Sequence, residues 1–124
     1  MSKLLAAFFV LHGIAHGVGF VVPWRLMEVE ETAYSTTLLA GRWDVGDVGI
    51  RVVGLLWLAT GLAFVVAGAG AWMMKAWWGP VAASAAAASL VLSVVGWPEA
   101  RVGVVLNILV LAALLSLRIG WWSL

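Results

Sequence analysis

The chain has 124 residues, of which 65% are hydrophobic and only 10% are charged, and its formal net charge is +1. A soluble domain of this composition would lack the polar residues that must cover an apolar core. The small net charge excludes the basic surface of a nucleic-acid-binding protein. The absence of cysteine excludes disulfides, thiolate metal ligands and cysteine nucleophiles. The composition therefore indicates an integral membrane protein.

Four long apolar runs fill most of the sequence, and polar segments separate them. A helix needs about 20 residues to cross a hydrocarbon core of about 30 Å. The runs predict an all-α, integral membrane, four-helix transmembrane bundle with up-down topology, formed as a single domain over residues 1–124. The predicted helices cover approximately residues 4–22, 50–74, 80–97 and 98–119.

The first predicted helix follows Lys3 and is stopped by Pro23. It is longer than the apolar part of a signal peptide, it contains two histidines, and no small-x-small cleavage site precedes Pro23. We therefore expect this helix to be retained as a membrane anchor.

The one long connection is the loop of residues 23–49, which contains several carboxylates. Met27, Tyr34 and Leu38 recur in it at about helical spacing, which fits either a short helix lying in the membrane interface or an ordered loop without a helix. At the end of the loop, Asp47 is placed to cap the second helix with its carboxylate.

Two prolines mark the boundaries of the last two helices. Pro80 fits the first position of the third helix, where a missing N–H group costs nothing. Pro98 disfavours a helical residue before it, so the third helix should end at Trp97. The short link makes the third and fourth helices antiparallel neighbours. The division of basic residues between the two sides favours a cytoplasmic location for both termini.

Small residues recur along the first two predicted helices. Gly13 and Gly17 are four apart, and Gly54, Gly61 and Gly68 are each seven apart, so both sets form stripes along a helix. Such stripes let helix backbones approach closely in a bilayer. They predict packing within the bundle or, alternatively, a seam between copies of the chain in a homo-oligomer.

Polar side chains within the apolar runs are the candidates for function. Such groups usually face a protein interior or a water-filled cavity. His12 and His16 are four residues apart and share one helix face, and the rise per residue places Asn107 at a depth similar to His16. The pattern predicts either a satisfied structural pair or a polar pocket that opens toward loop 23–49. The candidate ligand-binding residues are His12, His16, Arg51, Trp57, Ser93, Trp97, Arg101 and Asn107.

Each class of candidate residue has an expected role in this pocket. The histidine and asparagine side chains would supply hydrogen bonds, the two arginines would attract an anionic group, and the two tryptophans would form apolar walls. The hydroxyls of Thr60, Ser84, Ser89 and Ser93 are expected to bond the backbone of their own helices.

The histidine pair is also compatible with metal binding, haem binding or proton-coupled transport. Two histidines at this spacing can ligate one metal ion, but a site needs a third ligand, and Glu99 or a loop carboxylate would have to supply it. A haem would have to be shared between protomers, because His12 and His16 share one helix face. We assign no catalytic residue and no metal ligand, and the cofactor stays unknown. A metal- or haem-dependent redox subunit and a proton-coupled small dimeric transporter are the alternatives.

Two short motifs lie in the first two predicted helices. The first helix contains the His-Gly pairs His12-Gly13 and His16-Gly17, and the second opens with Arg51, followed by Gly54. In this arrangement the chain resembles the DoxX-like group of small bacterial four-helix membrane proteins. The resemblance implies a bacterial cytoplasmic-membrane protein that serves as an accessory to a redox or envelope system.

The sequence thus favours binding over catalysis, because no set of acid, base and nucleophile is apparent. The expected partners are the lipid bilayer, a small or amphiphilic ligand, and a second copy of the chain or a partner membrane protein. Nucleic acid is not expected.

Overall fold

The computed structural model describes residues 2–29 and 32–118. Most of them are helical, and four helical segments are long and apolar enough to cross a membrane, so the chain is a multi-pass membrane protein. In chain order the elements are α1 (Ser2–Ala15), α2 (Val18–Val21), β1 (Thr37–Leu38), β2 (Trp43–Asp44), α3 (Gly46–Trp72), α4 (Trp78–Val95) and α5 (Arg101–Arg118).

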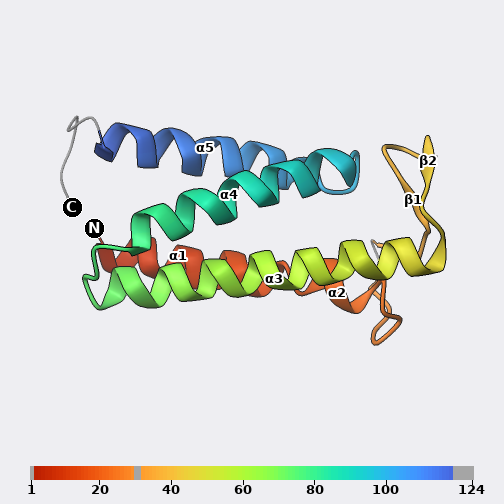
Figure 1. Ribbon diagram of the computed structural model, residues 1–124, viewed down its shortest axis with the longest axis horizontal. Coiled ribbons are helices and arrows are strands. Elements are labelled where there is room, and N and C mark those ends of the chain that lie inside the picture. The colour runs from red at the N-terminus through yellow and green to blue at the C-terminus, as the bar shows by residue number, and fades with distance from the viewer. Residues whose placement is uncertain (1, 30–31, 119–124) are drawn as a thin grey trace.

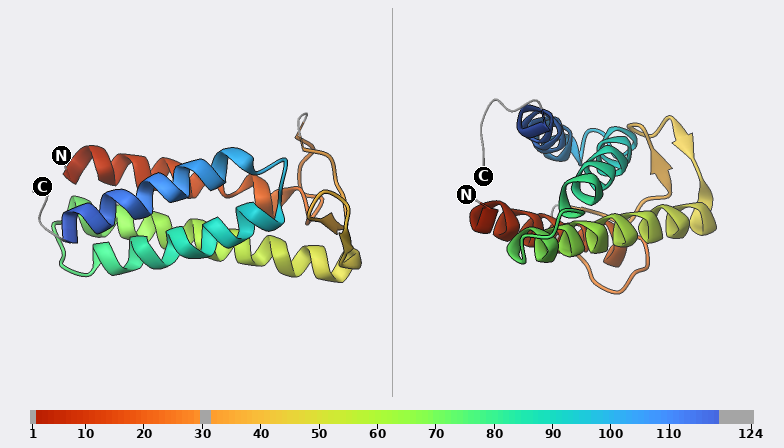
Figure 2. Two further views of the ribbon diagram at one scale, coloured as in Figure 1. Left: turned by 90° about the horizontal axis from the view of Figure 1, so that it is seen from above. Right: turned by 60° about the vertical axis from the view of Figure 1, so that its left-hand side comes forward.

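The long helices form two layers, and the helices within each layer run in opposite directions (Figures 1 and 2). One layer contains α1, α2 and α3, and the other is the hairpin of α4 and α5. α3 packs against α1 and α2 on one side and against α4 on the other, and α5 packs mainly against α4. α4 lies close to α3 near its own first residue and diverges from it toward the end of the molecule that carries β1 and β2.

Glycine allows the close approach of α1 and α3. A Cβ atom placed on Gly61 would lie 2.6 Å from the carbonyl oxygen of Gly13, and one on Gly68 would lie 2.8 Å from the carbonyl oxygen of Ala6. Gly54, at the other end of the predicted stripe, faces the side chain of Trp24. The stripe of α3 is therefore used for packing within the chain.

The apolar core lies in the half of the bundle that is remote from the two strands. Phe9 and Phe64 are fully buried there and stack with ring centroids 6.0 Å apart. α4 meets them with alanines, and this small-residue face lets α4 approach α3 closely. The buried core cluster consists of Phe9, Phe64, Ala67, Ala82, Ala85, Ala86 and Val110.

The first membrane span is interrupted, whereas the sequence predicts one continuous helix over residues 4–22. α1 ends at Ala15 and α2 begins at Val18. Between them the backbone tightens, because the N–H groups of His16 and Gly17 bond carbonyls three residues back, at 3.1 and 2.9 Å. Gly17, a weak helix former, lies at this point.

The long loop forms a hairpin instead of the alternative interfacial helix. Thr37 pairs with Asp44 and Leu38 with Trp43 in an antiparallel two-stranded sheet. The turn between the strands has positive φ at Leu39, Ala40 and Gly41, a conformation that the repeating Met27, Tyr34 and Leu38 pattern does not reveal.

Several helix boundaries also differ from the prediction. α3 begins four residues early, at Gly46, and the Asp47 side chain makes no capping bond there. α4 begins at Trp78, so Pro80 is its third residue. α5 begins at Arg101, because residues 96–100 form a turn closed by the Ala100 N–H to Gly96 carbonyl bond of 2.9 Å. Residue 119, the predicted end of the last helix, lies outside the described residues.

The Gly61–Gly13 contact gives a direct test of the packing. Gly61→Ala should lower the free energy of unfolding by about 1–3 kcal/mol, because the new methyl group meets backbone that cannot move independently. Gly79→Ala is the control, since a Cβ atom there meets nothing within 4 Å. Detergent titration of the purified protein measures both, and equal stabilities would contradict the packing described.

Candidate functional site

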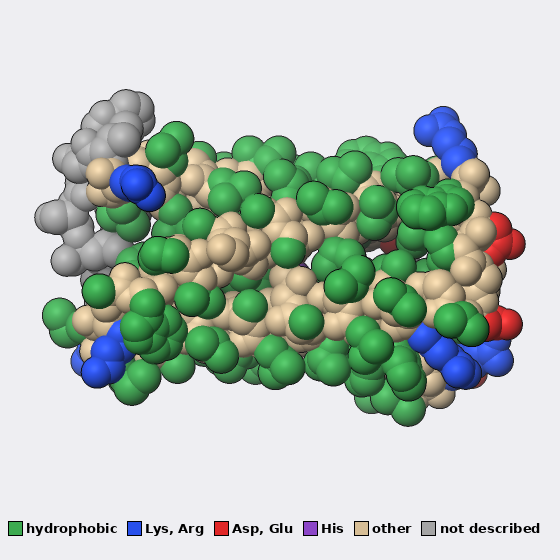
Figure 3. Space-filling model, viewed as in Figure 1, with side chains coloured by type: hydrophobic (Ala, Val, Ile, Leu, Met, Phe, Trp, Pro, Cys, Tyr) green, Lys and Arg blue, Asp and Glu red, His purple; other side chains and the backbone are tan. Residues whose placement is uncertain are grey.

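A cavity of about 640 Å³ lies at the hairpin end of the bundle. Its walls come from α2, the first half of α3, and the turn between α4 and α5, and residues 32–41 cover it. Figure 3 shows the surface hollowed between the two helix layers, at the end where the acidic side chains gather. The volume is within the range of about 300–1,000 Å³ that is usual for small-molecule sites.

The cavity exists because the layers diverge where the side chains are small. Gly96 and Ala100 line it from the turn between α4 and α5, Gly103 lines it from α5, and Ala15 lines it from α1. None of these residues is large enough to fill the space between the layers. The walls are mostly apolar, which suits the apolar part of a ligand.

Four polar side chains form a continuous hydrogen-bonded group at the inner end of the cavity, which we call the polar chain: His12 of α1, His16 of the turn after it, Ser89 of α4 and Asn107 of α5. His12 Nε2 lies 3.3 Å from Asn107 Oδ1, and Asn107 Nδ2 lies 2.8 Å from Ser89 Oγ. Ser89 Oγ lies 2.6 Å from His16 Nε2, and His16 Nδ1 lies 2.7 Å from the His12 carbonyl oxygen.

With both imidazoles neutral, the partners give each bond in the polar chain one direction. The His12 carbonyl only accepts, so His16 Nδ1 donates to it, and in the neutral ring His16 Nε2 then accepts from Ser89. Ser89 Oγ in turn accepts from Asn107 Nδ2, and Asn107 Oδ1 accepts from His12 Nε2. Two neutral imidazoles with opposite tautomers therefore satisfy these bonds.

The polar chain joins helices that otherwise touch little. It links α1 to α5 through His12, and the turn after α1 to α4 through His16, whereas the main backbone packing of α5 is against α4. His12, His16, Ser89 and Asn107 are all buried, and Phe64 covers the two rings at centroid distances of 4.7 and 5.2 Å. Interhelical hydrogen bonds in membranes contribute about 0.6 kcal/mol on average and about 1.7 kcal/mol at most.

Ser93 differs from the other hydroxyl groups of the helices. Thr60 and Ser84 donate to the carbonyls of Leu56 and Pro80, four residues back, as the sequence predicts. The same prediction is wrong for Ser89, which bonds His16 and Asn107. Ser93 Oγ is buried, yet it has no hydrogen-bond partner within the described part of the chain.

The structure brings most of the predicted site residues together. His12, His16, Trp57, Ser93 and Trp97 line the cavity. Asn107 is not among the lining residues; it is fully buried behind them and bonds His12.

The two arginines of the prediction do not line the cavity. The Arg51 guanidinium lies over the ring of Trp24, 5.7 Å from its centroid, and Arg101 is exposed. Glu99 lines the cavity in their place.

The prediction missed Ser89 and Gly103 as site residues, although their spacing carried a signal. Ser89 precedes Ser93 by four residues, and Gly103 precedes Asn107 by four, so each lies on the same helix face as a predicted residue. Gly103 also takes part through its backbone, since its carbonyl accepts from Asn107 Nδ2 at 2.7 Å.

The cover of the cavity is attached to α4. The backbone N–H of Leu39 donates to the Val95 carbonyl at 2.8 Å, and that of Ala40 donates to the Trp97 carbonyl at 3.0 Å. Leu38, at the start of the same turn, is buried. These bonds hold the hairpin turn against the end of α4, beside the cavity that the turn lines.

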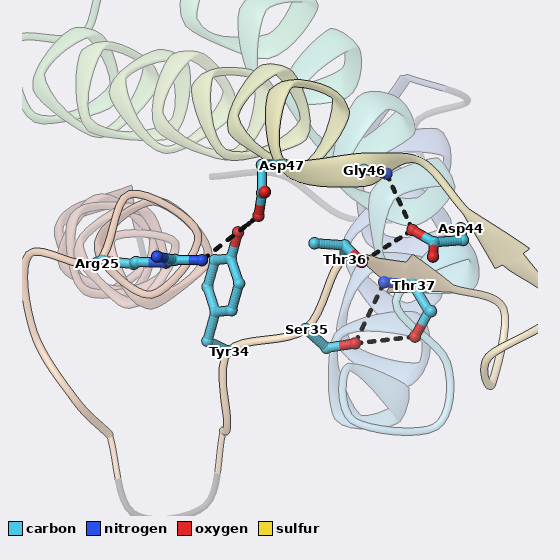
Figure 4. A network of polar contacts seen from close by, with 8 residues as sticks. All are labelled: Arg25, Tyr34, Ser35, Thr36, Thr37, Asp44, Gly46 and Asp47. Atoms are coloured by element: carbon cyan, nitrogen blue, oxygen red, sulfur yellow. Dashed lines mark hydrogen bonds and ion pairs between the residues drawn. The ribbon is translucent and has the colours of Figure 1, made fainter.

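A second polar group fixes the hairpin relative to α2 and α3 (Figure 4). The Tyr34 hydroxyl donates to Asp47, and Arg25 lies 3.4 Å from the same carboxylate. The Arg25 guanidinium also lies over the Tyr34 ring, 4.0 Å from its centroid. Because both charged groups are exposed, their ion pair adds less than about 1 kcal/mol.

Asp44 joins β2 to the start of α3 (Figure 4). Its carboxylate accepts from the Gly46 N–H group at 3.0 Å and from the Thr36 hydroxyl at 2.8 Å. These two donors, the backbone N–H first, hold the pKa of the Asp44 carboxyl below its ordinary value.

The described residues offer no ready metal site. In residues 2–29 and 32–118 no three His, Asp or Glu side chains come together. Both nitrogens of His16 and Nε2 of His12 already have hydrogen-bond partners. A metal or haem ligand role for this pair would require the polar chain to break.

Comparison of the chain with family models, with curated proteins and with solved structures found no match. The fold and the site define a multi-pass helical membrane protein with a largely apolar cavity between its helix layers, and its function is argued from that geometry.

Asn107 provides a test of the polar chain. Asn107→Leu keeps the branched shape but leaves the His12 donor without a partner and removes the amide that donates to Ser89 Oγ, so the free energy of unfolding should fall by about 1–3 kcal/mol. Ser116→Ala is the control on the same helix, because that hydroxyl bonds only the Ala112 carbonyl. A loss of stability no larger than that of the control would show that the polar chain does not hold α5 in the bundle.

Thr36→Val tests the electrostatics of the hairpin. Loss of the Thr36 hydroxyl should raise the pKa of Asp44 toward its ordinary value, and an NMR titration of the side-chain carboxyl measures this. The pKa of Asp44 is lowered in the folded protein, so its stabilising effect is present above the unfolded-state pKa and is lost as pH falls through the folded-state value. An unchanged midpoint would contradict the assignment.

Proposed function

We propose that this protein binds a small amphiphilic molecule within the membrane, in the cavity that opens toward loop 23–49. The observation that carries the proposal is the cavity of about 640 Å³ with apolar walls and the polar chain at its inner end. Apolar walls with a few fixed hydrogen-bonding groups are the usual composition of a small-molecule site.

The shape of the bundle supports binding rather than passage. Beyond the polar chain, Phe9 and Phe64 fill the interior and are fully buried. The remainder of that core is made of apolar side chains. A solute that reached His12 from the cavity would meet close-packed apolar groups, which suits a pocket with one entrance.

We place the protein in the bacterial cytoplasmic membrane, as the resemblance to the DoxX-like group implies. The His-Gly pairs that carry the resemblance now have structural roles: His12 and His16 form the polar chain, and Gly13 contacts α3. A role as an accessory subunit is compatible with an exposed α5, whose outer face could contact lipid, a second copy or a partner membrane protein. The redox and proton-coupled alternatives gain no support from the described residues, because no three His, Asp or Glu side chains come together in them and both histidines are engaged in hydrogen bonds within the bundle.

Filling the cavity tests the proposal. Val53 lines the cavity, and its neighbour Val52 is 51% exposed on the outside of the same helix. In nanodiscs, Val53→Trp should abolish saturable binding of terminally trifluorinated dodecyl amphiphiles, and Val52→Trp should leave it unchanged. ¹⁹F NMR separates bound from bilayer-dissolved probe.

Three probes with the same dodecyl chain are compared: the alcohol, the carboxylate and the trimethylammonium. Saturable binding of any one of them that Val53→Trp removes supports the proposed function. Absence of saturable binding for all three, or equal binding by both tryptophan variants, would refute it.

A further inference from the structure

We infer that the ligand carries an uncharged hydrogen-bonding head, such as a hydroxyl or carbonyl group, and that this head binds Ser93 Oγ beside Gly103. The inference rests on the proposed function and specifies the chemical class of the ligand. It follows from three features of the cavity wall: an unpartnered hydroxyl, a glycine that makes room for it, and the charges of the lining residues.

The Ser93 hydroxyl is the first feature. Ser93 lines the cavity, its side chain is 0% exposed, and its oxygen has no partner within residues 2–29 and 32–118. Buried hydroxyls without a partner are costly, and proteins rarely keep them. A ligand group in the cavity would supply the missing hydrogen bond.

Gly103 is the second feature, because it determines what Ser93 faces. A Cβ atom on Gly103 would collide with Ser93 Oγ, so any larger residue would displace the hydroxyl. The position of Gly103 is itself fixed, since its carbonyl accepts from Asn107 Nδ2. Gly103 also lines the cavity, and the space that a side chain there would fill is occupied by the Ser93 hydroxyl.

The charges of the wall are the third feature, and they select an uncharged head. Among the described residues that line the cavity there is no Lys or Arg, and Glu99 is the acidic one. An anionic head would lie unpaired in an apolar site, which is unfavourable. A cationic head would favour exposed Glu99 at the rim and would leave Ser93 without a partner. A neutral head alone satisfies Ser93 without bringing a charge into the cavity.

The position of Ser93 explains how such a ligand would lie. Ser93 is two residues before the end of α4 and one turn outside Ser89 of the polar chain. The head would therefore stay near the outer end of the helices, and the apolar part would lie against residues such as Val22, Ile50 and Val53.

The dodecyl probes test this inference in the same nanodisc assay. The alcohol should bind at least about tenfold more tightly than the carboxylate or the trimethylammonium. Ser93→Ala should weaken binding of the alcohol about three- to tenfold, the usual effect of one lost hydrogen bond. Ser84→Ala, on the same helix but bonded to the Pro80 carbonyl, should have no effect.

A second variant moves the hydroxyl instead of removing it. Gly103→Ala should weaken alcohol binding because its methyl group displaces Ser93 Oγ, and Gly79→Ala is its control. Thermal unfolding separates binding from folding: Ser93→Ala without ligand should be as stable as the wild type or more stable, because the removed hydroxyl has no partner.

Two outcomes overturn the inference. One is binding of the carboxylate or the trimethylammonium as tightly as the alcohol, and the other is wild-type alcohol affinity in Ser93→Ala. If Val53→Trp abolishes binding in either case, the proposed function stands and only the class of head group is wrong.

Discussion

The structure depends on one constraint, which is that polar side chains inside a bilayer must find partners within the protein. His12 and His16 meet it together, through Ser89 and Asn107 on two other helices. No two of these side chains could satisfy each other alone, because the Asn107 amide and each imidazole have two hydrogen-bonding ends. The result is a cross-link between α1, α4 and α5 that apolar packing alone would not specify, since lipid tails are as apolar as the helices they would replace.

This cross-link divides the bundle into two parts with different packing. On one side of it, small residues such as Gly61 and Ala86 bring the helices together around Phe9 and Phe64. On the other side the layers diverge, and the space between them remains open under the hairpin. The polar chain therefore does two things: it holds the layers together, and it forms the inner end of the cavity.

The sequence predicts the features that depend on local pattern. Apolar length indicates the four spans, and helical spacing brings His12, His16 and Asn107 to one site. Features that depend on distant contacts are not predictable in this way. Arg51 lies at the expected end of α3, but its guanidinium lies over the ring of Trp24 and does not line the cavity. The hairpin is fixed by bonds from Leu39 and Ala40 to the end of α4, some 55 residues away, and no local repeat encodes them.

Gly103 shows why the cavity and the cross-link belong to one arrangement. Its carbonyl orients the Asn107 amide, and that amide fixes the direction of the bonds to Ser89 and His12. Its missing side chain, on the same backbone unit, leaves the space that the Ser93 hydroxyl occupies. A larger residue at this position would change both the wall of the cavity and the support of the polar chain. Gly103 therefore both forms part of the cavity wall and helps to satisfy the buried polar groups, so the interior of the bundle and the wall of its cavity cannot vary independently.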